Sequence, residues 1–193
     1  MKYYPIFLNV KDRPCLVVGG GRVGARKTAT LVSAGASVTV VSPEFGEQLA
    51  AMPGIHREHR FFDPHDLEGV FLVFAATSDT AVNQWILAEA QKARVLCNSA
   101  DAPDQGDFIL PAVMSRGDLI CAVSTSGASP ALARNIRMEL AQRYGPEYAE
   151  FLGLMRAVRK KLLASGHDPE GHRRVFRTLL DKNLPGLLAA NDY

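Results

Sequence analysis

Short apolar runs alternate with amphipathic segments over the first hundred residues of the chain. Buried strands are predicted for residues 13–21, 36–42, 69–77 and 94–98, and a weaker strand at a sheet edge for residues 55–60. Helical spacing is found in residues 22–35 and 78–93, with a short helix at 44–52 and a helical turn at 62–69. Strand and helix therefore alternate up to Asn98, which predicts an α/β fold: a Rossmann-like parallel sheet with helices on both faces.

The ends of these helices carry their own signals. The first helix is predicted from the helical spacing of five residues, Val23, Lys27, Thr30, Leu31 and Ala34. Gly35 is placed to cap its C-terminus. Asp63 and Pro64 are typical of the N-cap and the first position of the helical turn. The second long helix has two candidate N-caps, Ser78 and Asp79.

The pattern changes after Asn98. Two apolar runs within residues 108–125, separated by Ser-Arg-Gly-Asp, predict an antiparallel hairpin. A strong helical pattern follows over residues 128–145. Residues 146–190 are predicted to be mostly helical, with a break at 166–169.

The helix over residues 128–145 has Ser129 as its cap and Pro130 as its first residue. Its shared apolar face consists of Leu132, Ile136 and Leu140. We divide the chain into a Rossmann domain (1–112), a dimerisation region (113–145) and a helical C-terminal domain (146–193). The last two are small and carry both apolar stripes and many cations, which is typical of a piece that completes its core in a second subunit.

Composition narrows the class of protein. The chain has 193 residues, 47% of them apolar, and a net charge of +2, which suits a folded domain with a smaller appendage and argues against a nucleic-acid binder. Cys15, Cys97 and Cys121 lie far apart in apolar runs, so we expect three reduced, buried thiols. With no signal peptide or membrane span expected, the prediction is a soluble cytoplasmic protein.

A glycine motif ends the first strand and opens the first helix. Gly19-x-Gly21-x-x-Gly24 in this strand–helix context predicts dinucleotide binding. Gly19 permits the tight turn, Gly21 lets the backbone approach a pyrophosphate, and Gly24 lets the helix pack close to the strand. The helix N-terminus adds free N–H groups and the positive end of its dipole.

The acidic residue that usually binds the ribose is replaced by Ser42, with Glu44 two positions further. Ser42, Glu44 or backbone groups are therefore the open alternatives for this contact. No arginine directly follows Ser42 to receive a 2′-phosphate, which favours NAD over NADP. Thr77 and Ser78 follow the fourth strand, at the edge where such sheets bind ligands.

Three aspartates follow the fifth strand: Asp101, Asp104 and Asp107. The same edge rule places Asn98 to Asp101 at the working end of the cofactor, where a carboxylate is suited to accept a proton as a hydride leaves. The alternative is that all three are loop acids that hydrogen-bond locally. The five histidines form no HExxH or Cys/His cluster, so we expect no metal site.

A second candidate anion site lies between the hairpin and the following helix, where hydroxyls and free N–H groups converge. Its members are Ser124, Thr125, Ser126 and Gly127, and Arg116, Arg134 and Arg137 are the cations placed to add charge. The alternative is a helix cap with solvated arginines.

Several stretches together resemble the dehydrogenase module of sirohaem synthase, that is, precorrin-2 dehydrogenase, which in some members is fused to or doubles as sirohydrochlorin ferrochelatase. The resemblance is found in four stretches: PIFLNVKDRPCLVVGGGRVGARK, AATSDTAVNQ, CNSADAPDQGDFILPAV and AVSTSGASPALAR. The resemblance implies NAD-dependent oxidation of precorrin-2 to sirohydrochlorin, with Asp101 of the DAP motif as the essential side chain. It implies cofactor contacts at Arg22, Val23, Pro43 and Glu44, and a homodimer. A serine that some members phosphorylate is Thr125 here.

Three readings of function stay open at this point. The chain is a dehydrogenase alone, or it also inserts Fe²⁺ or Co²⁺ into sirohydrochlorin, or it is a non-catalytic NAD-binding regulatory module. A small-molecule alcohol dehydrogenase is set aside, because a Tyr-x-x-x-Lys pair and zinc ligands are missing. Without the methyltransferase domain of fused members, the chain is not expected to make precorrin-2.

Overall fold

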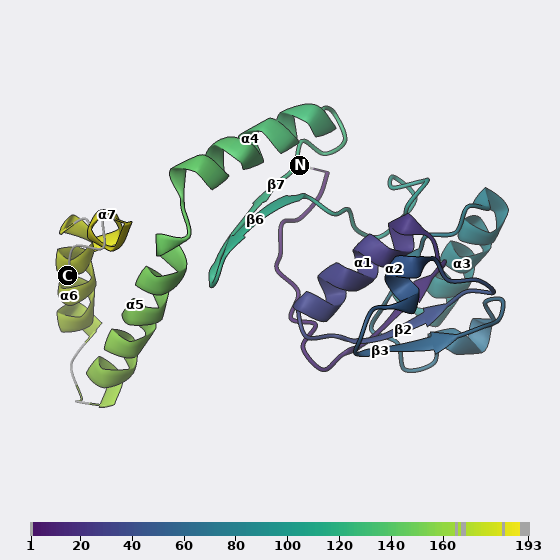
Figure 1. Ribbon diagram of the computed structural model, residues 1–193, viewed down its shortest axis with the longest axis horizontal. Helices are drawn as coiled ribbons and strands as arrows, with labels where there is room; N and C mark the ends of the chain where they lie inside the picture. Colours follow the sequence, from purple (N-terminus) through teal and green to yellow (C-terminus); the bar gives the residue numbers. More distant parts are fainter. Residues whose placement is uncertain (1, 165, 167–168, 183, 190–193) are drawn as a thin grey trace. The chain divides into compact units, whose positions relative to one another are not determined.

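The computed structural model describes residues 2–164, 166, 169–182 and 184–189 (Figure 1). Two compact units divide the chain, residues 1–109 and 110–193. A separate helical domain beginning near residue 146 stays a prediction.

A five-stranded parallel sheet forms the first unit, in the order β3-β2-β1-β4-β5. Its strands are β1 (Pro14–Val18), β2 (Ser37–Val41), β3 (Ile55–Glu58), β4 (Leu72–Ala75) and β5 (Leu96–Ser99). The helical elements between them are α1 (Arg22–Ser33), α2 (Glu47–Ala50), η1 (Pro64–Leu67) and α3 (Thr80–Ala93). The predicted α/β class is confirmed, with β3 at the sheet edge and β4 buried along its whole length.

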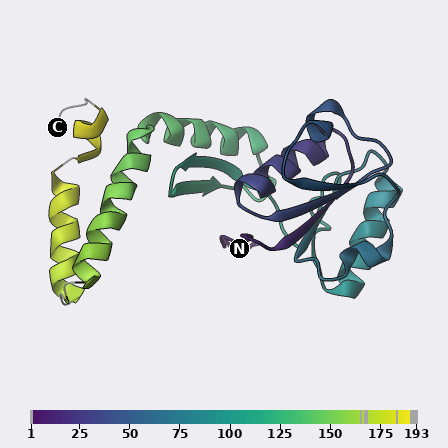
Figure 2. The same ribbon diagram turned by 60° about the horizontal axis from the view of Figure 1, so that its bottom comes forward.

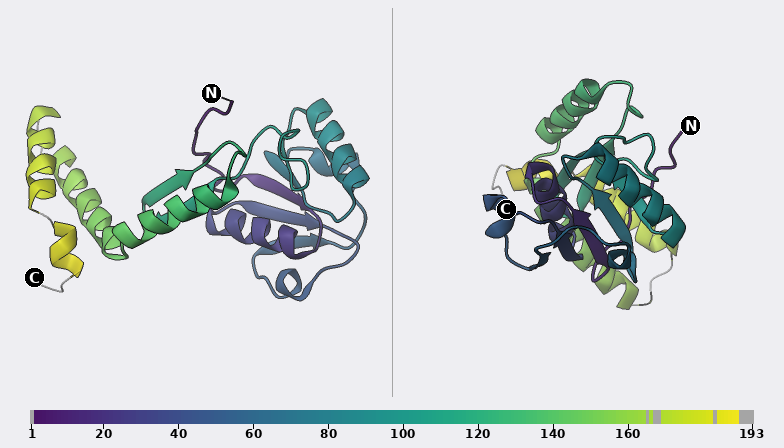
Figure 3. Two further views of the ribbon diagram at one scale, coloured as in Figure 1. Left: turned by 90° about the horizontal axis from the view of Figure 1, so that it is seen from above. Right: turned by 90° about the vertical axis from the view of Figure 1, so that its right-hand side faces the viewer.

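Alternate residues of the strands build two separate cores, one on each face of the sheet. Cys15 and Val17 pack with Leu31 of α1, whereas Leu16 and Val18 pack with Ile86 of α3. Figure 3 shows helices on both sides of this sheet. Burial on both faces explains the near-continuous apolar runs of the central strands.

Of the five residues whose spacing predicted α1, Lys27 and Leu31 lie on its buried face and the other three do not. Its buried residues are Gly24, Ala25, Lys27, Thr28 and Leu31, whereas Val23, Thr30 and Ala34 are exposed. A Cβ on Gly24 would lie 2.0 Å from the carbonyl oxygen of Gly19, so the helix must turn this residue toward the strand. That close approach rotates the inward face by about one residue. Gly35 follows the C-cap with a φ of +81°, as expected for a terminating glycine.

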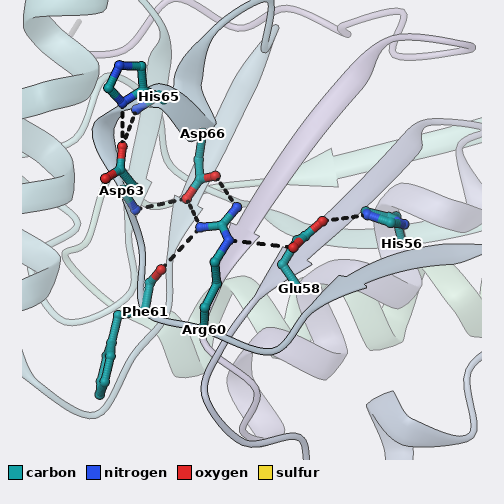
Figure 4. Close-up of polar contacts among 7 residues, drawn as sticks. All are labelled: His56, Glu58, Arg60, Phe61, Asp63, His65 and Asp66. Atoms are coloured by element: carbon teal, nitrogen blue, oxygen red, sulfur yellow. Dashed lines mark hydrogen bonds and ion pairs between the residues drawn. The ribbon is translucent and has the colours of Figure 1, made fainter.

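A surface network fastens the turn after β3 (Figure 4). Arg60 donates to both carboxylate oxygens of Asp66, at 2.6 and 2.9 Å. Asp66 also accepts from the backbone N–H of Asp63, which caps η1 as predicted. Glu58 joins the network through Arg60 at 3.5 Å and His56 at 2.7 Å. The bidentate pair makes η1 a fixed connection between the edge strand and β4.

The second unit contains a hairpin and four helices in its described part. The antiparallel strands β6 (Ala112–Arg116) and β7 (Leu119–Val123) are joined by Gly117 and Asp118 alone, so Ser115 and Arg116 belong to the strand and not to the separator. The helices are α4 (Pro130–Arg143), α5 (Glu147–Ala164), α6 (Pro169–Asp181) and α7 (Leu184–Ala189). Figure 2 shows α4 along the hairpin and α6 returning beside α5.

All three cysteines are free, and Cys15 and Cys97 are buried as predicted. Cys121 is only half-buried, because the two-stranded hairpin leaves its side chain at the margin of the small core around Met114. Among the described residues, no helix combines the length and apolar character needed to span a bilayer.

Two helical glycines give a matched test of the α1 contact. Gly24→Ala should lower the free energy of unfolding of the first unit by about 2–3 kcal/mol, because its Cβ cannot be accommodated. Gly153→Ala in α5, where nothing lies within 4 Å, should leave that transition unchanged. Urea unfolding followed by the fluorescence of Trp85, the one tryptophan, reports the first unit. Equal midpoints for Gly24→Ala and the wild type would contradict the packing argument.

Candidate active site

Three neighbouring strands end at the same level of the sheet. Val18 of β1 is in register with Ala75 of β4, and Ala75 is in register with Ser99 of β5. Three segments therefore begin next to one another at this edge of the sheet: the glycine loop, the segment after β4 and the acidic loop. This is the edge at which doubly wound sheets bind their ligands.

The glycine loop is held by contacts that leave no space for side chains. Gly19 has a φ of +124°, and a Cβ there would lie 2.3 Å from the carbonyl oxygen of Ala76. At Gly20, a Cβ would lie 1.9 Å from the carbonyl oxygen of Glu44. The Gly20 carbonyl accepts from the N–H of Gly46 at 3.0 Å. Gly20 lies outside the GxGxxG spacing, and sequence reasoning missed its role in joining the loop to the end of β2.

Gly21 differs from its neighbours because a Cβ there would meet nothing within 4 Å. It is the N-cap of α1, and no side chain caps this helix. Among the described residues, none accepts a hydrogen bond from the backbone N–H groups of Arg22, Val23 or Gly24. Open space, free donors and the positive end of a 12-residue helix fit the pyrophosphate of a dinucleotide.

The two side chains proposed for the ribose contact, Ser42 and Glu44, lie after β2 and differ in their exposure to solvent. Ser42 is buried, and its hydroxyl donates to the carbonyl oxygen of Glu44 at 2.7 Å. Pro43 and Glu44 are exposed. The carboxylate of Glu44 is thus available to a ligand, whereas the Ser42 hydroxyl proton is already engaged.

A buried amide fixes the segment after β4. Asn83, 1% exposed, accepts from the N–H and the hydroxyl of Thr77 at 3.0 and 2.8 Å and donates to its carbonyl at 3.2 Å. Ser78 is exposed, and Asp79 is the N-cap of α3, which decides between the two candidate caps. Sequence reasoning missed Asn83, although its place on the same stripe as Ile86 and Ala90 marks it as a polar residue facing the core.

The three aspartates after β5 have three different environments. The Asp107 carboxylate accepts from the backbone N–H of Cys97 at 2.8 Å, and its own N–H donates back to the Cys97 carbonyl at 2.8 Å. Asp104 pairs with Lys2 at 2.7 Å. Asp101 accepts from the hydroxyl of Ser99 at 2.6 Å and is exposed. All three aspartates are exposed, but Asp107 fastens the loop to β5 and Asp104 pairs with a lysine, whereas the partner of Asp101 is Ser99 at the end of β5.

Hydrogen bonds hold the pKa of Asp101 below its usual value. The Ser99 hydroxyl is the main cause; partial burial acts in the opposite direction, and the side chains of Asn83 and Thr80 lower the pKa further. Asp101 is thus a carboxylate at neutral pH. The Asn83 amide that fixes Thr77 also supports this carboxylate, so one buried residue serves both segments.

Asn98 is turned into the sheet rather than toward the edge. It is 3% exposed, its Oδ1 accepts from Lys27 Nζ at 3.4 Å, and its Nδ2 donates to the carbonyl of Phe108 at 2.8 Å. Both polar atoms of its side chain thus have a partner within the protein, and the cofactor contact of Asn98 stays a prediction.

The remaining predicted residues lie in the second unit. Arg116 donates to the carbonyls of Tyr144, Ala141 and Ser115, so its guanidinium caps the end of α4, a structural role that was not anticipated. Between β7 and α4, the Ser124 hydroxyl accepts from the N–H of Ser126, and the Thr125 hydroxyl accepts from that of Ser129.

The loop between β7 and α4 has two consecutive residues with positive φ, Ser126 at +53° and Gly127 at +90°. Arg134 and Arg137 follow on α4, the first exposed and the second half-buried. The local hydrogen bonds and the Ser129 cap agree with the helix-cap alternative, and the anion site stays a prediction.

Comparison with known proteins places these features in a family. Residues 6–112 match the family model described as "Putative NAD(P)-binding", and residues 116–143 match "Sirohaem biosynthesis protein central". The siroheme synthase of Methylobacillus flagellatus is 41% identical over 182 residues, which cover 91% of this chain and 38% of that protein. The siroheme synthase of Nitrosomonas europaea is 43% identical over 203 residues, which cover 100% of this chain and 43% of that protein.

Among solved structures, SirC, precorrin-2 dehydrogenase, is similar with a TM-score of 0.78 and 27% identity, over 95% of this chain and 92% of that chain. The chain thus spans less than half the length of the two curated siroheme synthases, but nearly all of SirC.

The role of Asn83 is open to a direct test. Asn83→Leu should destabilise the first unit by about 1–3 kcal/mol, because it leaves the Thr77 donors without their acceptor. It should also raise the pKa of Asp101, which loses a donor. Gln84→Leu, on the exposed side of α3, is the matched control and should change neither quantity. Carboxyl NMR titration measures the pKa, and an unchanged value in Asn83→Leu would refute the shared support.

Proposed function

This chain belongs to the NAD(P)-binding family whose model covers more than half of it, and we propose that it is an NAD-dependent dehydrogenase that oxidises precorrin-2 to sirohydrochlorin for sirohaem synthesis. The siroheme synthases and SirC support this reading through their similarity to the chain. The observation that carries it is the ionised Asp101, held by Ser99 at the same sheet edge as the open glycine loop.

The oxidation removes two electrons and two protons from the macrocycle, as one hydride and one proton. NAD⁺ supplies the hydride acceptor when bound. Asp101 takes the proton, and its low pKa ensures that the carboxylate is already deprotonated at neutral pH. The Ser99 hydroxyl, 2.6 Å from the carboxylate, orients it, so that little reorganisation is needed when the proton arrives.

The cofactor would be held by backbone more than by side chains. Gly19 and Gly24 shape the turn, and Gly21, Arg22 and Val23 offer the space and the N–H groups for the pyrophosphate. Glu44, exposed beside Pro43, would accept from the ribose hydroxyls. Its negative charge would repel a 2′-phosphate, which supports NAD over NADP.

The substrate is rich in carboxylates, so it calls for donors and cations. We assign these to the loop between β7 and α4 and to the helix that follows it: Ser124, Thr125, Ser126, Gly127 and Arg134. The exposure of Ser124, Ser126 and Arg134 supports this assignment. Arg116 receives no such role, because its guanidinium is engaged at the end of α4.

A homodimer would complete the second unit. One face of the β6–β7 hairpin is exposed along both strands, with Val113 at 52% and Ile120 at 48%, while Met114 on the other face is buried. An uncovered apolar sheet face of this kind is typical of a subunit interface. We further place the protein in the cytoplasm, where a thiol such as Cys121 stays reduced.

Sedimentation measures the assembly. We expect the wild type to sediment as a dimer of the 21.0-kDa chain and Ile120→Glu as a monomer, because the charge cannot be buried between two hairpins. Phe61→Glu, which changes a residue 79% exposed in the first unit, should remain dimeric. A dimeric Ile120→Glu would exclude this face from the interface.

Anaerobic turnover of precorrin-2 with NAD⁺ tests the activity. Asp101→Asn should lower kcat by about 100- to 10,000-fold, because the amide cannot take the proton. Asp104→Asn, which changes only exposed contacts with Lys2 and Tyr3, should keep wild-type turnover. NADH formation and the absorption of sirohydrochlorin are the two readouts.

The other outcomes select between the alternatives. Faster metal insertion than in buffer, once Fe²⁺ or Co²⁺ is added to the product, would make the enzyme a ferrochelatase as well. Wild-type protein that binds NAD⁺ and never reduces it in the presence of precorrin-2 would favour the regulatory module.

A further inference from the structure

A lysine is buried beneath the acidic loop. Lys27 of α1 is 8% exposed, and its Nζ lies 3.4 Å from Asn98 Oδ1 and 5.2 Å from the centre of the Phe74 ring. In the described part of the chain, no carboxylate forms an ion pair with it. Burial lowers the pKa of Lys27 to about 8, so the ammonium form still predominates at neutral pH.

An unpaired buried cation is unfavourable for folding, and an apolar side chain of similar length would suit this position better. Local choices that oppose stability are expected where a protein needs them for function.

Lys27 is the first member of a chain of contacts that ends on the acidic loop. Lys27 donates to Asn98, and Asn98 donates to the carbonyl of Phe108 at 2.8 Å. The Phe108 ring packs edge-on against Phe74 at 5.5 Å, and Phe74 is the ring that lies under the ammonium. Asn98 and Phe108 flank residues 99–107, the loop that carries Asp101. The charge on Lys27 therefore acts at the point where this loop closes.

We propose that Lys27 is a positioning residue, which through Asn98 fixes the closure of the 99–107 loop and thereby the location of the Asp101 carboxylate. The inference rests on the proposed function for its catalytic consequence, whereas the closure of the loop is a property of the protein without substrate.

Few other charges act on the ammonium. Arg26, beside it on α1, lowers its pKa further. Cys15 of β1 lies in the core on the same sheet face, and burial raises its pKa to about 11, which keeps it a neutral thiol. Glu47 on α2 is exposed, and Asp107 in the loop is bound to the Cys97 N–H. Between pH 6 and pH 9, Lys27 is therefore the group at this closure that changes charge.

The test compares Lys27→Met with Lys92→Met, which removes an exposed lysine from α3. The folded-state pKa of Lys27 lies below its unfolded value, so its unfavourable contribution is full below pH 8 and fades as the pH rises toward 10.5. At pH 7, Lys27→Met should therefore melt about 3–6 °C above the wild type. This difference should shrink toward pH 10, and Lys92→Met should show no such trend.

Amide hydrogen exchange measures how well the backbone of the 99–107 loop is protected in the protein without substrate. Lys27→Met should speed exchange in residues 99–108 by about tenfold while the sheet strands keep their protection. If Lys27→Met fails to fold, the wild type decides: its loop protection factors, corrected for intrinsic exchange, should fall as the pH passes 8 while those of the strands hold. Unchanged loop protection in either experiment overturns the proposal.

Turnover then links closure to catalysis. We expect the wild-type kcat to fall as the pH passes 8, where Lys27 loses its charge. Lys27→Met should lower kcat about 10- to 100-fold, leave KM for NAD⁺ unchanged and abolish this inflection. A loosened loop with wild-type kcat would overturn the positioning role. A wild type without any turnover would reject the proposed function and leave the exchange result standing.

Discussion

Backbone contacts at the glycine loop are the constraint on which the rest of the site depends. Gly19 lies against the carbonyl of Ala76, Gly20 against that of Glu44, and Gly24 against that of Gly19, each at a distance that excludes a Cβ. These contacts join the ends of β1, β2 and β4 into one edge and set the rotation of α1. The same rotation leaves the N–H groups of α1 open at Gly21 and turns Lys27 inward, beneath β5.

The three carboxylates of the acidic loop have different partners, and only Asp101 is held from the end of β5 by a side-chain hydroxyl. Asp107 fastens the loop to the Cys97 backbone, and Asp104 pairs with Lys2. Asp101 is held by hydroxyl and amide donors, which keep it charged without covering it. Its lowered pKa differs from the raised value expected of a base buried beside its substrate. The site therefore offers a preformed anion that needs no deprotonation before it accepts a proton.

Local signals in the sequence were enough for the strands, the helices, the close packing at Gly19 and Gly24 and the caps at Asp63 and Ser129, because periodicity and capping are encoded in neighbouring residues. They were not enough for contacts between distant segments. The inward turn of Lys27 follows from the approach of Gly24 to Gly19, and the capping role of Arg116 follows from the carbonyls of α4. The shared support of Thr77 and Asp101 by Asn83 likewise requires two loops to meet.

The central claim is that the cofactor and Asp101 meet at one edge of the sheet. A crystal structure of the protein grown anaerobically with NAD⁺ measures this most directly. We expect the pyrophosphate to lie against Gly21 and the first turn of α1, with the nicotinamide ring over the ends of β4 and β5 beside Asp101. A nicotinamide ring directed away from β5, or a dinucleotide bound outside the glycine loop, would contradict it.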